Sequence, residues 1–197
     1  FYNNYSSPSN AYLVIIGDVN YDEIKSKVTD LFGSWDSKEV SSISFPSPNN
    51  PDETEIIFVD MPNGVQSVVS VINTVEFNKK KSDYFAALVA NRILGGGGAG
   101  RLFNNLREDK GWTYGSYSGI SESYKTKGLV IAQAQVRNEV TDSAALELLM
   151  ELDKMKNTFV LDEELNSAKA KYTGNFVLSL ENPSTIAGFA RNIITQD

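Results

Sequence analysis

The stretch "ILGGGGAGRLFNNLREDKGWTYGSYS" (residues 93–118) decides the fold of this sequence, because three elements follow one another in it without a long connector. Helical periodicity precedes the glycines, carried by Phe85, Leu88, Val89 and Ile93. A second, short helix is predicted after the glycines, from Leu102, Phe103 and Leu106, and Gly111 ends it. Alternation then begins, so residues 112–121 are predicted to form a β-strand.

Four further segments outside this stretch are typical of strands. Residues 54–60 and 65–73 are predicted to form two strands joined by a Pro-Asn-Gly turn, and residues 128–136 a partner for 112–121. The continuous apolar run at 11–19 predicts a strand buried on both faces.

The alternation in two of these strands predicts which side chains share a face. Tyr114, Ser116, Ser118 and Ile120 are expected together in the first, and Val130, Ala132, Ala134 and Val136 in the second.

The remaining periodic segments indicate helices. Asn20 is expected to cap a helix that ends at Gly33. Three more helices are predicted after the last strand: one carrying Leu148, one from about Asp162, and one after Pro183. Because the strands come in adjacent pairs with short turns, we predict a single α+β domain over residues 1–197. Its sheet is expected to be mixed and mainly antiparallel, with helices packed on one face.

The composition excludes several classes of function. The net charge of −7 argues against nucleic acid as a partner, and no apolar run reaches the roughly 18 residues of a membrane-spanning helix. The chain has neither histidine nor cysteine, so it lacks a Ser-His-Asp triad, a cysteine nucleophile and the usual zinc ligands. We therefore predict no metal site and no cofactor in this chain.

The glycines invite a phosphate-binding interpretation, which their context contradicts. Gly95, Gly97 and Gly100 have the spacing G-x-G-x-x-G, but a dinucleotide site needs a strand before them, and here a helix precedes them. A P-loop would need Gly-Lys-Ser/Thr, where this chain has Gly100-Arg101-Leu102. Two interpretations remain: a flexible connector between helices, or a loop whose bare backbone contacts a ligand or peptide.

The same stretch resembles the glycine-rich segment of the insulinase, pitrilysin and mitochondrial-processing-peptidase family of zinc metallopeptidases. "FYNNYSSPSNAYLVIIGDVNYDEI" (1–24) and "LDEELNSAKAKYTGNFVLSLENP" (161–183) also resemble that family, so the similarity spans almost the whole chain. Its most specific part is residues 93–118. The resemblance implies a processing-peptidase-like metallohydrolase domain, excised from a larger peptidase of two or four domains.

The resemblance also implies a role for named residues. In the family, one half carries zinc through an inverted His-x-x-Glu-His motif, which this chain lacks, and the opposite half supplies an arginine and a tyrosine at the spacing of Arg107 and Tyr114. These two are the expected catalytic residues. The expected peptide-contacting residues are the loop glycines Gly95, Gly96, Gly97, Gly98 and Gly100. The expected partners are the zinc-bearing half, on the same chain or as a separate subunit, and a peptide substrate.

The chemistry of the pair is compatible with that role, and simpler roles stay open. Arginine is always charged and a tyrosine hydroxyl is a neutral donor, so both could hold a peptide carbonyl that becomes negative. Alternatively, Arg107 pairs with Glu108, Asp109 or a carbonyl at the helix end, and Tyr114 fills the core. The larger protein is expected to be a zinc metalloendopeptidase, of which this chain alone is inactive. The alternative is a catalytically silent family member that serves as a scaffold or binding subunit.

Overall fold

The computed structural model describes residues 1–123 and 125–195, which fall into two compact units. The larger unit comprises residues 45–173, and the smaller one combines residues 1–44 with the chain from Gly174 onward. The single domain predicted for residues 1–197 stays a prediction, and each unit is described by itself. No helix of the described residues is long and apolar enough to cross a membrane.

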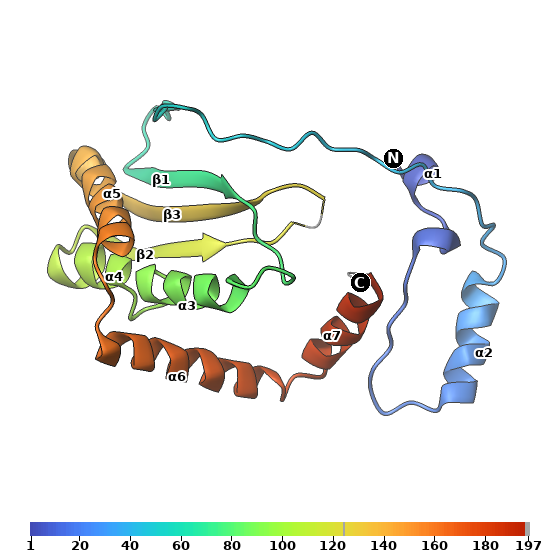
Figure 1. Ribbon diagram of the computed structural model, residues 1–197. Helices are drawn as coiled ribbons and strands as arrows, with labels where there is room; N and C mark the ends of the chain where they lie inside the picture. Colours follow the sequence, from blue (N-terminus) through green and yellow to red (C-terminus); the bar gives the residue numbers. More distant parts are fainter. Residues whose placement is uncertain (124, 196–197) are drawn as a thin grey trace. The chain divides into compact units, whose positions relative to one another are not determined.

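The larger unit is built on an antiparallel sheet of three strands (Figure 1). These are β1 (Gln66–Val75), β2 (Thr113–Ile120) and β3 (Gly128–Arg137), in the order β1-β3-β2. β3 pairs with both neighbours, so that Ala134 lies opposite Val69 on one side and Ser116 on the other. The sheet confirms the predicted α+β class and the strands predicted around 65–73, 112–121 and 128–136.

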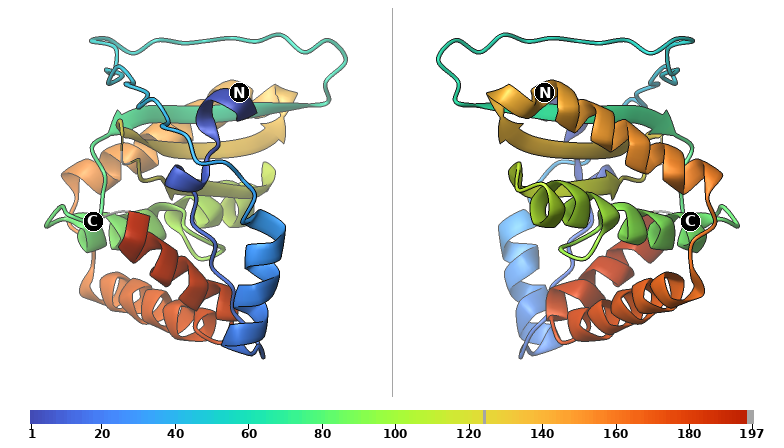
Figure 2. Two further views of the ribbon diagram at one scale, coloured as in Figure 1. Left: turned by 90° about the vertical axis from the view of Figure 1, so that its right-hand side faces the viewer. Right: turned by 90° about the vertical axis from the view of Figure 1, so that its left-hand side faces the viewer.

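Helices cover one face of this sheet. They are α3 (Tyr84–Leu94), α4 (Arg101–Phe103), a π-helix (Asn104–Asp109), a 3₁₀ turn (Asn138–Val140) and α5 (Thr141–Asn157). α5 packs against β1 and β3, and Figure 2 shows it running across those two strands, whereas α3 and α4 pack against β2. α6 (Asp162–Ser179) begins in this unit and continues past its boundary.

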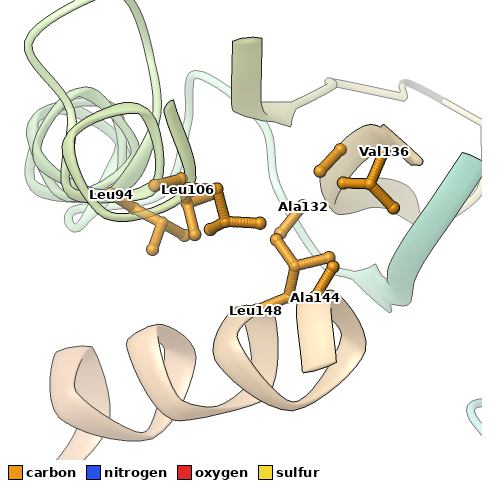
Figure 3. Close-up of a cluster of buried hydrophobic side chains, with 8 residues drawn as sticks. Leu94, Leu106, Ala132, Val136, Ala144 and Leu148 are labelled. Carbon is orange, nitrogen blue, oxygen red and sulfur yellow. The ribbon is translucent and has the colours of Figure 1, made fainter. Parts of the chain in front are cut away.

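The core lies between the helices and β3. The predicted alternation of β3 is confirmed, since Ala132, Ala134 and Val136 are buried on the helix side. They meet Leu102, Leu106 and Leu148, each completely buried, and Figure 3 shows α5 and the α4 region converging on β3 at this point. Fully burying a leucine contributes about 1.5–3 kcal/mol, so this cluster anchors the chain on either side of residues 107–114.

The smaller unit holds α1 (Tyr2–Tyr5), a 3₁₀ turn (Pro8–Asn10), α2 (Tyr21–Phe32) and α7 (Pro183–Thr195). The predicted cap of α2 is confirmed, because the Asn20 side chain accepts hydrogen bonds from the backbone N–H groups of Asp22 and Glu23 at 3.0 and 3.3 Å. Gly33 follows its last residue, as predicted.

Two predicted strands are absent from the described structure. Residues 11–19 and 54–60 are not in strands, and the apolar side chains of Ile56, Ile57, Phe58 and Val59 are 83–92% exposed. The ends of the second segment are nevertheless tied: the Asn50 side chain bonds the backbone of Thr74 at 2.7 and 3.0 Å, and a turn closes between Met61 and Gly64. The prediction was wrong because an apolar run records only strand propensity, whereas a strand also needs a neighbouring ladder of backbone groups.

Candidate functional site

Arg107 lies at the end of a continuous helical segment that changes its pitch. α4 passes into the π-helix, in which the Lys110 N–H bonds the Asn105 carbonyl oxygen at 3.1 Å. Gly111 then adopts a φ of +63°, a conformation that costs glycine little. Its N–H bonds the Arg107 carbonyl oxygen at 3.2 Å, and the Trp112 N–H bonds that of Leu106 at 3.0 Å. The chain therefore turns at Gly111, as predicted, and leads directly into β2.

Tyr114 is directed out of the core by a β-bulge at the start of β2. Thr113 lies opposite Val136 but Ser116 lies opposite Ala134, so β2 carries one residue more than β3 over this interval. The Thr113 hydroxyl lies 2.6 Å from the Gln135 carbonyl oxygen and accepts a hydrogen bond from the Gly115 N–H at 3.1 Å. The prediction that Tyr114 and Ser116 share a face is wrong, because the extra residue reverses the alternation: Ser116 is buried and Tyr114 is 83% exposed.

The bulge and the turn bring the two predicted catalytic residues together. The guanidinium carbon of Arg107 lies 5.5 Å from the centroid of the Tyr114 ring, within the range of a cation–π contact. Arg107 Nη1 also lies 3.4 Å from the Thr113 carbonyl oxygen, a long hydrogen bond that holds the side chain toward β2. Packing of Tyr114 in the core, the simpler alternative, is contradicted by its exposure.

The alternative role of Arg107, an ion pair with its neighbour, is present but weak. Arg107 Nε lies 3.8 Å from a carboxylate oxygen of Glu108, and both side chains are substantially exposed. Exposed pairs of this kind contribute about 0–1 kcal/mol. Most of the guanidinium's five donors therefore stay available to a ligand.

A groove of about 410 Å³ adjoins Tyr114 on the sheet. Its lining side chains carry no charge: Gln66, Val68, Thr113, Tyr117, Gln133 and Gln135. The Gln135 amide donates to Gln66 at 2.8 Å, which fixes two of these groups. Neutral amides beside aromatic rings can bond and stack with a polypeptide, whereas they offer no counter-charge to a phosphate.

Three of the loop glycines, Gly95, Gly96 and Gly100, leave no room for a side chain, and a Cβ on Gly96 would lie 2.8 Å from the Arg92 Cα. Gly95 and Gly100 are buried, and the Gly95 carbonyl oxygen accepts the Ser118 N–H of β2 at 2.9 Å. A Cβ on Gly95 would lie 2.6 Å from that nitrogen, and a Cβ on Gly100 would lie 2.7 Å from the Gly95 Cα. The backbones of α3, the loop and β2 thus approach too closely for any side chain. This part of the loop is therefore tightly packed and is not a flexible connector.

The loop becomes more accessible toward Gly98. Gly96 and Gly97 are partly exposed, Gly98 is exposed, and a Cβ on Gly98 would meet no atom within 4 Å. The loop therefore combines a packed base with an open tip. Contact between these glycines and a peptide stays a prediction.

A buried polar network next to Arg107 was missed by sequence reasoning. The Asn105 side-chain amide donates to Glu147 at 2.9 Å and to Glu151 at 2.8 Å, while its oxygen accepts from Lys110 at 2.8 Å. The hydrogen bond from Asn105 holds the pKa of Glu147 below its ordinary value of 4.5, against the opposing effect of burial. Glu151 is almost completely buried and also accepts from Lys154 at 2.7 Å. The one available signal is that both glutamates lie one turn apart in α5.

A second polar link connects the loop to α6. Arg101, directly after Gly100, donates two hydrogen bonds to Glu164, at 2.8 and 2.6 Å. This fork geometry lowers the pKa of Glu164 and raises that of Arg101, mainly through the hydrogen bonds themselves.

The residues present do not fit a metal site. Within residues 1–123 and 125–195, no three side chains of the types that ligate metals are gathered in one place. The whole sequence has no histidine or cysteine. The site described above can therefore hold and polarise a polar ligand, but it offers no ligand set for zinc.

Known proteins are similar to this chain in sequence and in fold. A family model described as "Peptidase M16 inactive domain" matches residues 1–172. A zinc protease of Rickettsia felis, described as uncharacterized, is 28% identical over 183 residues, which cover 92% of this chain and 42% of that protein. The chain spans between 25% and 45% of the length of the curated relatives it matches.

Two crystal structures show the same fold. A protease from Helicobacter pylori matches with a TM-score of 0.76 and 22% identity, over 92% of this chain and 44% of that one. A peptidase M16 inactive domain from Pseudomonas fluorescens matches with a TM-score of 0.71 and 23% identity, over 87% of this chain and 40% of that one. At these identities the likeness concerns the fold alone.

Proposed function

We propose, because the chain belongs to the peptidase M16 inactive-domain family, that it is the metal-free part of a zinc peptidase and helps to bind and cleave peptides. The relatives that carry zinc in their description are more than twice as long as the matched region. In this proposal the zinc is held by the remaining part, on the same polypeptide or on a separate subunit, which the lack of histidine and cysteine in this chain supports.

The observation that carries this proposal is the cation–π contact between Arg107 and the exposed Tyr114. The Tyr114 ring is 83% exposed at the edge of the neutral groove, and the Arg107 guanidinium lies 5.5 Å from its centroid. A tyrosine kept out of the core by a bulge costs burial energy, and such bulges are frequent beside active sites. Its hydroxyl and the guanidinium are both hydrogen-bond donors.

In the proposed role, the two side chains donate to the carbonyl oxygen of the peptide bond that is cleaved. Negative charge develops on that oxygen during hydrolysis, so donors fixed beforehand stabilise the transition state more than the ground state. The groove lined by Tyr117, Gln133 and Gln135 would hold the adjoining peptide through its amides and ring faces. The exposed tip of the glycine loop would offer backbone hydrogen-bonding groups to the same peptide.

Kinetics of the complete, zinc-loaded protein test this role. Tyr114→Phe removes one donor with little change in volume, so kcat should fall by about 10²–10³ on a quenched peptide. Arg107→Ala should be at least as damaging, and the double variant should lose less than the sum, because both donors act on one oxygen. Tyr117→Phe is the matched control on the same strand: it loses a hydroxyl but keeps the ring that lines the groove, so its kcat should stay within about threefold of the parent's.

The competing role is a catalytically silent scaffold. A complete protein that cleaves no peptide would favour it. So would a Tyr114→Phe variant whose kcat equals that of Tyr117→Phe within about threefold, because an oxyanion donor loses far more.

A further inference from the structure

A small pocket forms where the glycine-rich loop meets the end of α3 and the first turns of α6. Its volume is about 90 Å³. Its polar groups come from Arg92, Glu164, Ser167 and Lys171, and Gly97 supplies backbone. The pocket shares no lining residue with the groove beside Tyr114. It is therefore a separate place for a ligand group.

The charge in this pocket is opposite to that of the chain. Glu164 is held by both hydrogen bonds of Arg101, so its negative charge is already matched. Arg92 and Lys171 form no ion pair with any carboxylate in the part of the chain that the structure describes. Two cations thus line one small hollow in a protein with a net charge of −7.

Arg92 is oriented toward the loop by the loop's own backbone. Its Nη1 donates to the Gly96 carbonyl oxygen, which uses one of its five N–H donors. A Cβ on Gly97 would lie 3.0 Å from the same nitrogen, so the guanidinium rests directly against bare backbone. This arrangement leaves the remaining donors available at the pocket.

We propose that this pocket binds a carboxylate group of the peptide, either its C-terminal carboxyl or an Asp or Glu side chain. The guanidinium of Arg92 matches the planar geometry of a carboxylate, Lys171 adds an ammonium, and Ser167 adds a hydroxyl. Ala99 and Ala168 add only small apolar side chains to the lining, so they do not obstruct such a group. This inference rests on the proposed function only in taking a peptide as the ligand.

The test measures binding by the complete protein after zinc is removed with a chelator, so that no peptide is cleaved. Three labelled peptides share one neutral sequence: the first ends in a free carboxyl, the second in an amide, and the third in an amide with one internal Gln replaced by Glu. Fluorescence anisotropy should show at least one carboxylate peptide binding about five- to tenfold more tightly than the neutral amide. The peptide that gains identifies the source of the carboxylate.

Lys171→Met should remove this preference, and its effect should shrink as salt is raised. Because Lys171 is exposed on α6, the variant should keep its fold, which circular dichroism checks. Lys169→Met is the matched control, since Lys169 is exposed on the same helix but does not line the pocket. It should keep the full preference.

Equal affinity for the three peptides overturns the inference, and so does failure of every peptide to bind. A preference that survives in Lys171→Met overturns it as well. The kinetic test of the proposed function is independent, because Tyr114→Phe changes turnover without touching this pocket. A carboxylate preference combined with unchanged turnover in Tyr114→Phe would sink the catalytic role and leave the pocket standing.

Discussion

Replacement of Asn105 by leucine tests whether the buried polar network holds the π-helix that carries Arg107. The two side chains have the same branching and the same number of heavy atoms, so the change mainly replaces hydrogen-bonding groups by methyl groups. Asn105 donates to Glu147 at 2.9 Å and to Glu151 at 2.8 Å, and it accepts from Lys110 at 2.8 Å. The leucine side chain would face two carboxylates with nothing to donate.

The size of the expected loss in stability depends on which hydrogen-bond partners the two carboxylates keep. A hydrogen bond to a charged group contributes about 1.5–3 kcal/mol, so two of them set an upper limit of roughly 3–6 kcal/mol. Glu151 keeps Lys154 at 2.7 Å and Glu147 keeps Lys110 at 3.2 Å, which reduces the loss. We expect the free energy of unfolding to fall by about 2–4 kcal/mol, as for other disrupted buried networks.

Urea unfolding followed by circular dichroism measures this loss, with Asn104→Leu as the control. Asn104 is the preceding residue and is exposed, so both substitutions change helix propensity alike and only one breaks the network. The urea midpoint should drop for Asn105→Leu while the m-value stays constant. A difference between the two variants below about 0.5 kcal/mol would refute the reasoning, because a change at an unimportant surface position has that size.

Three further outcomes are expected. The two hydrogen bonds from Arg101 lower the pKa of Glu164. The carboxylate therefore stabilises the folded protein at pH values above its ordinary pKa of 4.5, and this stability is lost as the pH falls through the lower pKa of the folded state. Near neutral pH, the free energy of unfolding from urea titration should therefore be about 1 kcal/mol lower for Glu164→Gln than for the parent. In acid the two values should converge. Gly100→Ala should destabilise by about 1–3 kcal/mol because its Cβ would lie 2.7 Å from Gly95 Cα, whereas Gly98→Ala, which meets no atom within 4 Å, should differ little in thermal unfolding. Metal analysis after chelation and reloading should find no stoichiometric zinc on the isolated chain, since it lacks histidine and cysteine.

Features that depend on near neighbours in the chain could be predicted from the sequence alone. The helix before the glycines, the turn at Gly111 and the cap at Asn20 were all predicted correctly, because periodicity, backbone freedom and capping act within a few residues. The exclusion of histidine and cysteine chemistry followed from composition. The proximity of Arg107 to Tyr114 was also predictable, since only residues 110–112 separate their two elements.

Features that depend on residues far apart were decided only by the tertiary structure. The bulge that exposes Tyr114 arises because β2 has one residue more than β3 between two paired positions. It cannot be predicted from the sequence of either strand alone. Asn105 meets its two glutamates across 42 and 46 residues of chain, and Arg101 meets Glu164 across 63. Residues 54–60 have the sequence of a strand but do not form one, because strand formation also requires a partner from elsewhere in the chain. Propensity is a local property, whereas pairing and burial are settled by which distant backbone and side-chain groups arrive at the same place.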